Sequence, residues 1–299
     1  MSEAITAEAV LEATTTRVDA RLEQFAQELG GGAPLVEAVR YAISGGGKRL
    51  RPALCVAAYR AAGGEQEGII DIAAAIELIH TYSLVHDDLP CMDDDALRRG
   101  RPTTHVVYGS AMAAVAGAAL IPLAFRLLAQ GGEQLDLESA TIRAMTRELA
   151  TAAGGSGMIG GQLLDLAAEG HAIAIDDLEA IHHAKTGALI AASVRCGALA
   201  AGAAPPVLQA LRGYGRALGL AFQIMDDLLD ETANTAALGK TAGKDRARKK
   251  ATFPAMLGLE QTGARAREEL AAALHAIHGT GLGTAELEAL ARFAIERKH

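Results

Sequence analysis

Two clusters of aspartates are the part of the sequence best suited to chemistry. The first, HDDLPCMDDD at residues 86–95, places five carboxylates within nine residues at the end of an apolar segment. Carboxylates this close repel one another, so the cluster is costly unless a cation offsets its charge. Hard divalent cations such as Mg²⁺ take oxygen ligands of this kind. Because a charge run alone favours a solvated acidic loop, a second feature has to decide between the two.

The second cluster, FQIMDDLLD at residues 222–230, lies inside an apolar stretch with helical spacing. Separations of three, four and seven residues return to one helix face, so its polar side chains are expected on one side of one helix. These side chains are Gln223, Asp226, Asp227 and Asp230. Buried carboxylates without partners are expensive, which argues against a plain surface role. The two clusters together predict facing acidic walls that hold several Mg²⁺ ions.

Basic residues gather in short glycine-containing segments. These segments are GGKRLR at 46–51, RRGR at 98–101 and KTG at 185–187, with further lysines at Lys240, Lys244 and Lys250. Arginine forks and lysine point charges bind phosphate oxygens. The first segment is not a Walker loop, because Ala42 and Arg49 stand where that motif needs glycine and Ser/Thr. Each segment alone is typical of a solvated surface, but together with two metal-type acidic clusters they favour diphosphate binding.

Histidines give no independent site. A metal-dependent phosphohydrolase could be proposed from the pair His86 and Asp87, but it needs further histidine ligands in a matching motif. His171, His182 and His183 are far away in the sequence and belong to no such motif, so we expect them on the surface.

Helical spacing of apolar residues runs through almost the whole chain, and glycine or proline marks each break. Helices are expected at 7–29, 34–43, 52–62, 69–86, 109–129, 137–153, 161–168, 176–201, 207–230, 253–259, 263–277 and 284–296. No segment shows the alternation of a half-buried strand, and the polar segment 231–252 is expected as a loop. No change in composition marks a linker. The prediction is therefore one all-α domain over residues 1–299, a single large helical bundle.

Composition narrows the functional classes. Half of the 299 residues are hydrophobic, and the net charge of −8 argues against a broad nucleic-acid surface. The charge-free stretch 106–125 is about as long as a membrane span, but its glycines and Pro122 favour a central helix of a soluble bundle. The three cysteines are scattered, which argues against a disulfide framework or a zinc site and fits a reducing compartment. Without a signal peptide, the expected location is cytoplasmic.

In order and spacing, these motifs resemble those of the short-chain trans-polyprenyl diphosphate synthases, and most closely the bacterial farnesyl diphosphate synthases. The matching segments are 46–52, 87–100, 160–165, 185–187, 222–230 and 240–254, so the resemblance covers nearly the whole chain. It implies an isoprenoid synthase fold, a bundle around a central cavity. It also implies Mg²⁺-dependent head-to-tail condensation of isopentenyl diphosphate with dimethylallyl or geranyl diphosphate. The reaction would give farnesyl diphosphate by ionisation, condensation and elimination, in a homodimer.

The resemblance also assigns roles to individual residues. Three Mg²⁺ ions would be held by the aspartates of both clusters, namely Asp87, Asp88, Asp93, Asp226, Asp227 and Asp230. The residues expected to act in catalysis are Asp87, Asp93, Asp226, Lys185 and Lys240. The allylic diphosphate would be bound by Arg98, Lys185 and Lys240, with Thr186, Gln223 and Lys250 nearby. Isopentenyl diphosphate would be bound by Lys48, Arg51, His80 and Arg99.

Product length is expected to depend on Tyr82 and Ser83, which precede Asp87 by five and four residues. Tyr82 lies about 7.5 Å down a helix from Asp87. In the family an aromatic at this position accompanies short products, although ordinary core packing would also explain it. One departure from the family is Ala118, which replaces the aspartate of a Gly-Asp-Ala-Leu-Leu run and could cost a supporting hydrogen bond.

Three other functions are compatible with parts of this pattern. A geranyl or geranylgeranyl diphosphate synthase uses the same chemistry and stops at another length. A class I terpene cyclase also ionises diphosphates, but it usually lacks the second DDxxD motif and the second diphosphate site. A catalytically silent partner subunit is opposed by the intact Asp87, Asp93, Asp226 and Lys185.

Overall fold

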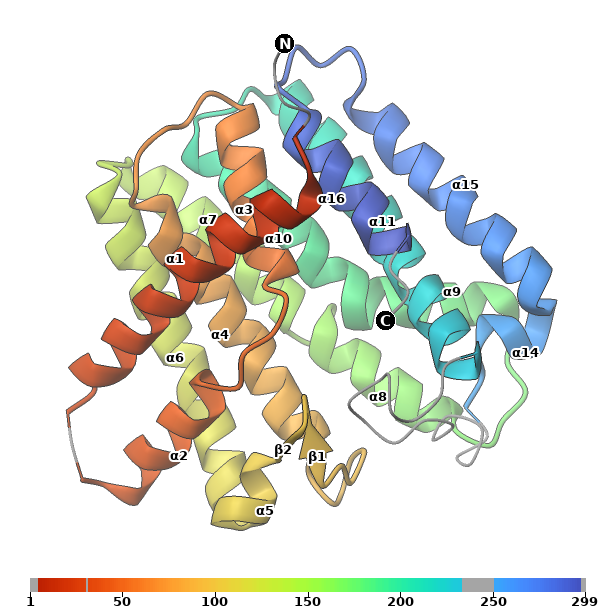
Figure 1. The fold of residues 1–299 in the computed structure, drawn as a ribbon, viewed down its shortest axis with the longest axis horizontal. Coiled ribbons are helices and arrows are strands. Elements are labelled where there is room, and N and C mark those ends of the chain that lie inside the picture. The colour runs from red at the N-terminus through yellow and green to blue at the C-terminus, as the bar shows by residue number, and fades with distance from the viewer. Residues whose placement is uncertain (1–4, 31, 233–249, 297–299) are drawn as a thin grey trace.

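The computed structural model describes residues 5–30, 32–232 and 250–296 (Figure 1). Helices joined by turns and loops make up most of these residues, and the only strands among them form one very short hairpin. The helices are α1 (Ala7–Glu28), α2 (Pro34–Ile43), α3 (Leu50–Ala61), α4 (Ile69–Asp87), α5 (Thr104–Tyr108), α6 (Ser110–Gln134), α7 (Ser139–Ala153), α8 (Met158–Ala168), α9 (Ile175–His182), the π-helical turn η1 (His183–Gly187), α10 (Ala188–Ala200), α11 (Pro205–Thr232), α14 (Phe253–Leu257), α15 (Leu259–Ile277) and α16 (Ala285–Glu296). The strands are β1 (Leu97–Arg98) and β2 (Arg101–Pro102). The all-α prediction is confirmed.

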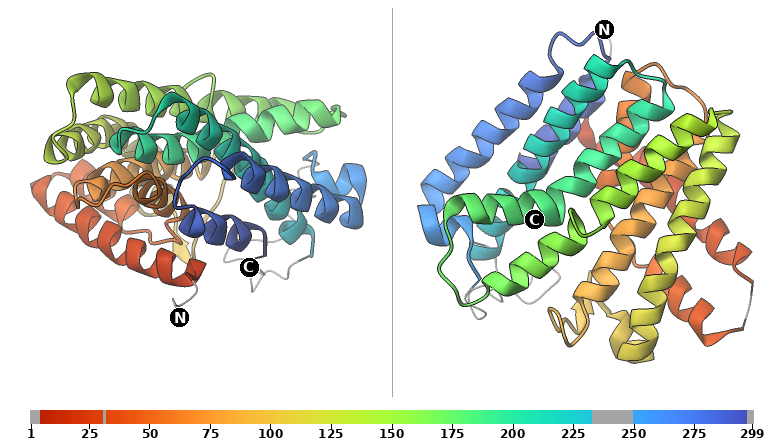
Figure 2. Two further views of the ribbon diagram at one scale, coloured as in Figure 1. Left: turned by 90° about the horizontal axis from the view of Figure 1, so that it is seen from above. Right: turned by 180° about the vertical axis from the view of Figure 1, so that it is seen from behind.

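Helix α4 runs through the centre of the bundle because it is apolar on every side. Ile72, Ile76 and Ile79 are completely buried, and α4 packs most extensively against α6 and then against α3. Figure 2 shows from above that α1 lies on one side of α3 and α4, and α7 on the other, while α2 packs against α6. Helices α10, α11, α15 and α16 enclose a second part of the core. The polar residues at the C-terminal end of α4 are thus carried into the middle of the molecule.

The turn before α3 depends on left-handed backbone. Gly46 and Gly47 have φ of 68° and 128°, and Arg49 follows with φ of 48°. A side chain at Gly47 would collide with the Arg99 guanidinium, 2.3 Å from the place of its Cβ. Glycine therefore allows the chain to pass beneath Arg99 and brings Lys48 to the edge of the bundle.

Two local features differ from the expectation. The strands β1 and β2 pair Leu97 with Pro102 and Arg98 with Arg101, which contradicts the expected absence of strands. Their two-residue loop, Arg99-Gly100, has positive φ at both positions, as a tight hairpin turn requires. Strands of two residues are too short to show alternation, which is why the pattern missed them. The expected helix 176–201 is likewise divided, because a π-helical turn separates α9 from α10.

By length and composition, α4 and α6 could each cross a membrane, which by itself is weak evidence. The apolar window of α4 is 78% buried inside the protein, so α4 is a core helix. The window of α6 is only 39% buried, and its outward face remains apolar.

Candidate active site

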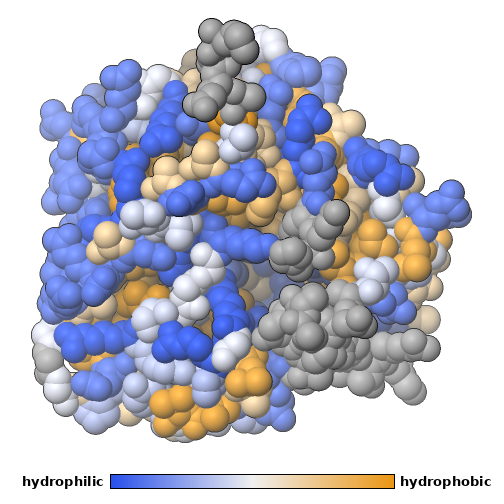
Figure 3. Space-filling model, in the orientation of Figure 1, coloured by the Kyte–Doolittle hydropathy of each residue, from blue (hydrophilic) through white to orange (hydrophobic). Residues whose placement is uncertain are grey.

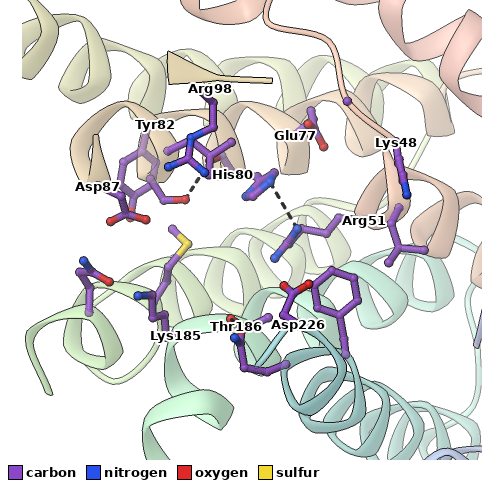
Figure 4. Close-up of a pocket in the computed structure, with 18 of the residues that line it drawn as sticks. Lys48, Arg51, Glu77, His80, Tyr82, Asp87, Arg98, Lys185, Thr186 and Asp226 are labelled. Atoms are coloured by element: carbon purple, nitrogen blue, oxygen red, sulfur yellow. Dashed lines mark hydrogen bonds between the residues drawn. The ribbon is translucent and has the colours of Figure 1, made fainter. Parts of the chain in front are cut away.

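A cavity of about 880 Å³ opens between α4 on one side and α8, η1 and α11 on the other (Figure 4). Most of the predicted site residues line it. These are Lys48, Arg51, His80, Tyr82, Ser83, Asp87, Arg98, Arg99, Lys185, Thr186, Gln223, Asp226 and Asp230. The sequence motifs therefore converge on one place, as the resemblance implied.

The first acidic cluster begins at the last residue of α4. The backbone N–H of Asp93 donates to the Asp87 carbonyl at 2.7 Å, which folds the loop back over the helix end. Burial raises the pKa of Asp87 from 3.8 to about 6; Lys185 acts against this increase and Asp93 adds to it. The Asp87 carboxylate is therefore poised to gain a cation at neutral pH.

Asp88 stabilises the loop of the first acidic cluster by pairing with Arg98. It is buried and accepts two hydrogen bonds from Arg98, at 3.0 and 2.5 Å, and Arg98 also contacts Asp95 at 3.4 Å. Burial alone would lower the pKa of Arg98, but Asp88 raises it. The loop is thus held closed by its own ion pairs, with Arg98 at the cavity wall.

The second acidic cluster faces the first across the cavity. Figure 4 shows Asp87 on the α4 side of the cavity, and Lys185 of η1 and Asp226 of α11 on the other side. Asp226 and Asp230 line the cavity, but Asp227 does not. The expectation that all polar residues of this cluster share one side fails for Asp227, because the next residue along a helix is rotated by about 100°.

Lysines from two distant segments meet on Asp165 of α8. The Asp165 carboxylate lies 2.6 Å from Lys185 Nζ and 3.2 Å from Lys250 Nζ. Burial would raise the pKa of Asp165, but the two lysines outweigh it and the pKa is lowered. Lys250 also reaches Asp93 at 3.5 Å, so it bridges α8 and the first acidic cluster. Sequence reasoning assigned Asp165 no role.

The sequence feature that could have pointed to Asp165 is the preceding GGQ at residues 160–162. A Cβ on Gly161 would lie 2.2 Å from the Lys185 backbone nitrogen, so glycine allows α8 to contact η1 directly. Asp165 is one helical turn further and meets the Lys185 side chain. The segment 160–165 therefore positions Lys185.

The end of the cavity toward α3 is basic. Arg51 Nη1 lies 3.4 Å from His80 Nε2. Burial and Arg51 lower the pKa of His80 well below its usual value, so the neutral ring accepts from the guanidinium. Arg49, between Lys48 and Arg51, is buried and bonded to Asp19 (2.8 Å) and Glu77 (2.6 Å). Arg49 thus anchors the strained turn that presents its two neighbours.

Tyr82 and Ser83 lie beneath the first acidic cluster. The Tyr82 ring is 3% exposed, and its hydroxyl donates to the Ala153 carbonyl at 3.0 Å. Its edge packs on the His86 ring, with centroids 5.8 Å apart. Ser83 donates to the His80 carbonyl at 2.8 Å. Tyr82 is consequently fixed from two sides at the wall of the cavity.

The donor set suits Mg²⁺ bound together with a phosphate ligand. Within residues 5–30, 32–232 and 250–296, no three His, Cys, Asp or Glu side chains are close enough to hold a metal on their own. Mg²⁺ takes one or two carboxylates and completes its shell with water and phosphate oxygens. The Gln162 amide, buried at the cavity wall, has no hydrogen-bond partner among the described residues. A polar ligand in the cavity would satisfy it.

Three other expectations have different outcomes. Lys240 lies outside the described residues. Ala118 is exposed on the outer face of α6, so the replaced aspartate is not a part of this cavity. The surface position expected for His182 is wrong, because its ring is buried at the junction of α9 and η1, 6% exposed. It packs against Asp227 and Phe253, residues too distant in the sequence to reveal the contact.

Comparison with known proteins gives one consistent result. The polyprenyl synthetase family model matches residues 33–281. The chain is 46% identical over 292 residues to farnesyl diphosphate synthase of Escherichia coli strain K12, covering 96% of this chain and 97% of the relative. It is 44% identical over 251 residues to geranylgeranyl pyrophosphate synthase 4 of Arabidopsis thaliana, covering 81% of this chain and 66% of the relative.

Solved structures agree in fold over the whole chain. An apo FPP/GFPP synthase from Zymomonas mobilis superposes with a TM-score of 0.84 at 35% identity, covering 97% of this chain and 98% of the other. A geranyltransferase from Helicobacter pylori, complexed with magnesium and isoprenyl diphosphate, gives a TM-score of 0.79 at 34% identity. That comparison covers 96% of this chain and 95% of the other.

Proposed function

The chain belongs to the polyprenyl synthetase family, and from this premise we propose that it is a farnesyl diphosphate synthase. It condenses isopentenyl diphosphate head to tail with dimethylallyl diphosphate and then with geranyl diphosphate. The observation that carries this proposal is the meeting of two acidic walls and two separate basic groups in one cavity. A single-substrate enzyme has no use for the second basic group.

The allylic diphosphate fits the end of the cavity where Lys185, Thr186 and Gln223 lie near Asp87 and Asp226. Bound Mg²⁺ would be held by Asp87 and Asp93 on one wall and Asp226 on the other, with Asp230 nearby, and would neutralise charge on the diphosphate. We propose three ions, because two acidic walls must be joined through one diphosphate group. The structure of the Helicobacter relative holds magnesium with isoprenyl diphosphate, which supports the choice of metal.

The reaction depends on stabilising the charge of the leaving diphosphate and on excluding water, and less on a general base from the protein. The allylic C–O bond breaks and its electron pair leaves with the diphosphate, where Lys185 stabilises the new charge. The isopentenyl double bond then attacks the allylic cation, and a proton is lost from the adjacent carbon to the released diphosphate. Ile159, Leu163 and Phe222 give the cavity an apolar lining that a prenyl chain would cover. Water has to be kept from the cation, because it would otherwise trap the cation as an alcohol.

Isopentenyl diphosphate fits the basic end. Lys48 approaches the cavity from the turn before α3, Arg51 from the first turn of α3, and Arg99 from the hairpin loop. His80 is neutral and holds Arg51 in place, so it positions a ligand to the diphosphate and removes no proton. Figure 4 places Lys48 and Arg51 at the opposite end of the cavity from Asp87 and Lys185.

Product length follows from the fixed Tyr82 ring, which supports a chain of farnesyl length. The second candidate is a geranylgeranyl diphosphate synthase, because relatives with that name match at 44–47% identity. A deeper cavity would be needed for it, and Tyr82 closes the space beneath Asp87.

We also propose a homodimer formed through α5 and α6. The outward face of α6 carries Ala111, Val115, Ala118 and Pro122, all exposed and without charge. Val106 and Val107 of the neighbouring α5 are 52% and 46% exposed. Figure 3 shows an apolar patch at the lower edge of the molecule, where α5 lies. Because a continuous apolar face of this kind marks an association surface, a second copy is its natural occupant.

The cytoplasm is the proposed location. All three cysteines are free thiols, and Cys55 and Cys196 are buried in the core. A reducing compartment keeps such thiols unpaired.

Product analysis tests the proposed function. The purified protein is incubated with Mg²⁺, isopentenyl diphosphate and either dimethylallyl or geranyl diphosphate, and dephosphorylated products are separated by chromatography. We expect farnesol as the main product from both starters. Geranylgeraniol would support the second candidate, a cyclic hydrocarbon from one substrate would support a cyclase, and no Mg²⁺-dependent diphosphate release would support a silent subunit.

A further inference from the structure

Asp227 is the carboxylate of the second acidic cluster that does not face the cavity. It is 6% exposed, whereas Asp226 and Asp230 on the same helix line the cavity. Three donors from three different elements, α9, α11 and α14, converge on Asp227. A carboxylate engaged in this way has little capacity left for a metal ion.

The first donor is His182, at the end of α9. Its Nε2 lies 3.3 Å from Asp227 Oδ2, and because a carboxylate oxygen can only accept, the imidazole donates. The same ring stacks on Phe253, with centroids 5.6 Å apart and planes at 29°. His182 thus contacts both Asp227 and the residue that Asp227 holds.

The second donor is the backbone N–H of Phe253, 3.1 Å from Asp227 Oδ2. Phe253 is the first residue of α14, where the N–H has no partner within the helix. Its side chain is completely buried. Lys250 lies three residues earlier, which is at most about 10 Å of extended chain. Asp227 therefore sets the place from which Lys250 reaches Asp165 and Asp93.

The third donor is Gln223, whose Nε2 lies 3.2 Å from Asp227 Oδ1. The Gln223 carbonyl in turn accepts from the Thr186 hydroxyl at 2.8 Å. The bonds run in one direction, from Thr186 through Gln223 to Asp227. Thr186 and Gln223 line the cavity, so Asp227 orients two cavity-lining groups on one side and the Lys250 segment on the other.

We propose that Asp227 and His182 are positioning residues, which hold Thr186, Gln223 and Lys250 in register around the allylic diphosphate, and that Asp227 is not a metal ligand. This inference rests on the proposed function and deepens it, because it divides the second acidic cluster into a metal-binding part and a positioning part. The metal-binding part is Asp226, with Asp230.

The test compares Asp227→Asn and His182→Leu with Asp226→Asn in the full-length protein. An asparagine cannot accept from all three donors, and a leucine donates nothing. For both positioning variants we expect KM for geranyl diphosphate to rise about tenfold, the effect of losing one buried hydrogen bond to a charged group. The Mg²⁺ concentration for half-maximal rate and the KM for isopentenyl diphosphate stay as in the wild type. His182→Gln, which keeps a donor on a side chain of similar reach, recovers most of the loss.

A second readout does not need turnover. Mg²⁺ with inorganic diphosphate should raise the melting temperature of the wild type, because a ligand that binds only the folded state stabilises it. We expect Asp227→Asn to melt lower without ligand but to keep this rise, and Asp226→Asn to lose it.

The proposal is overturned if Asp227→Asn loses the rise or needs as much extra Mg²⁺ as Asp226→Asn. It is equally overturned if folded His182→Leu has the wild-type KM for geranyl diphosphate. If Asp227→Asn does not fold, the two His182 variants decide. A wild type that condenses nothing would instead refute the proposed function, so the two failures are distinguishable.

Discussion

Replacing Tyr82 with alanine should lengthen the product. The ring lies beneath Asp87, 3% exposed, and its hydroxyl is bonded to the last residue of α7. One turn further down α4 the same face carries Leu78, about 6 Å below Tyr82 along the axis. An extended five-carbon unit spans about 5 Å. The space opened down to Leu78 therefore accommodates one more unit, and Tyr82→Ala should convert farnesyl into geranylgeranyl diphosphate.

The change also has a cost in stability. Removing a buried aromatic ring lowers the free energy of unfolding by about 3 kcal/mol, and the Ala153 carbonyl loses its donor. Tyr82→Phe is the matched control, because it keeps the ring and loses only the hydroxyl, at about 1 kcal/mol. We expect the control to make farnesyl diphosphate as the wild type does.

The assay is chromatography of dephosphorylated products after incubation with geranyl diphosphate and excess isopentenyl diphosphate. Circular dichroism and urea unfolding establish that each variant is folded. A folded Tyr82→Ala protein that still stops at fifteen carbons would refute the view that this ring is the floor. A longer product from Tyr82→Phe would mean that the hydroxyl, and not the ring, sets the length.

Three further predictions concern charge and assembly. Because burial raises the pKa of Asp87 from 3.8 to about 6, the folded metal-free protein holds a proton there that the unfolded chain has lost, and stability falls as pH rises through that window. Urea unfolding at a series of pH values should show that the free energy of unfolding falls by about 2 kcal/mol through this window, and Asp87→Asn should abolish the fall. An unchanged pH dependence of stability in that variant would count against the assignment. Asp165→Asn weakens the contacts with Lys185 and Lys250 and should lower kcat/KM for geranyl diphosphate roughly thirtyfold; an unchanged value would remove Asp165 from the site. Val115→Glu should give monomers in analytical ultracentrifugation, whereas intact dimers would place the interface elsewhere.

Much of the site could be predicted because its residues occur in local patterns. Short segments carry residue types that indicate their chemistry directly. Examples are the turn GGKRLR, the aspartates at helical spacing and the sequence KTG. Helices were equally accessible, since apolar spacing of 3.6 residues sets both where they run and which face they bury.

The rest depends on contacts between distant segments. Asp165 becomes a site residue only because Gly161 lets α8 contact η1, and His182 is buried only because α11 and α14 close over it. Asp227 is the same residue type as Asp226, but its side chain points away from the cavity. Helical spacing gives the direction of Asp227, but neither its contacts with His182 and Phe253 nor the contacts of Asp165 follow from spacing along one helix.

The central claim is that both acidic walls serve one diphosphate while a second diphosphate is held at the basic end of the same cavity. A crystal structure with Mg²⁺, isopentenyl diphosphate and an unreactive thio-analogue of geranyl diphosphate tests it most directly. We expect the analogue's diphosphate between Asp87 and Asp226 with metal on both sides, and the isopentenyl diphosphate at Lys48 and Arg51. Metal on one wall alone, or diphosphates in separate cavities, would contradict the account.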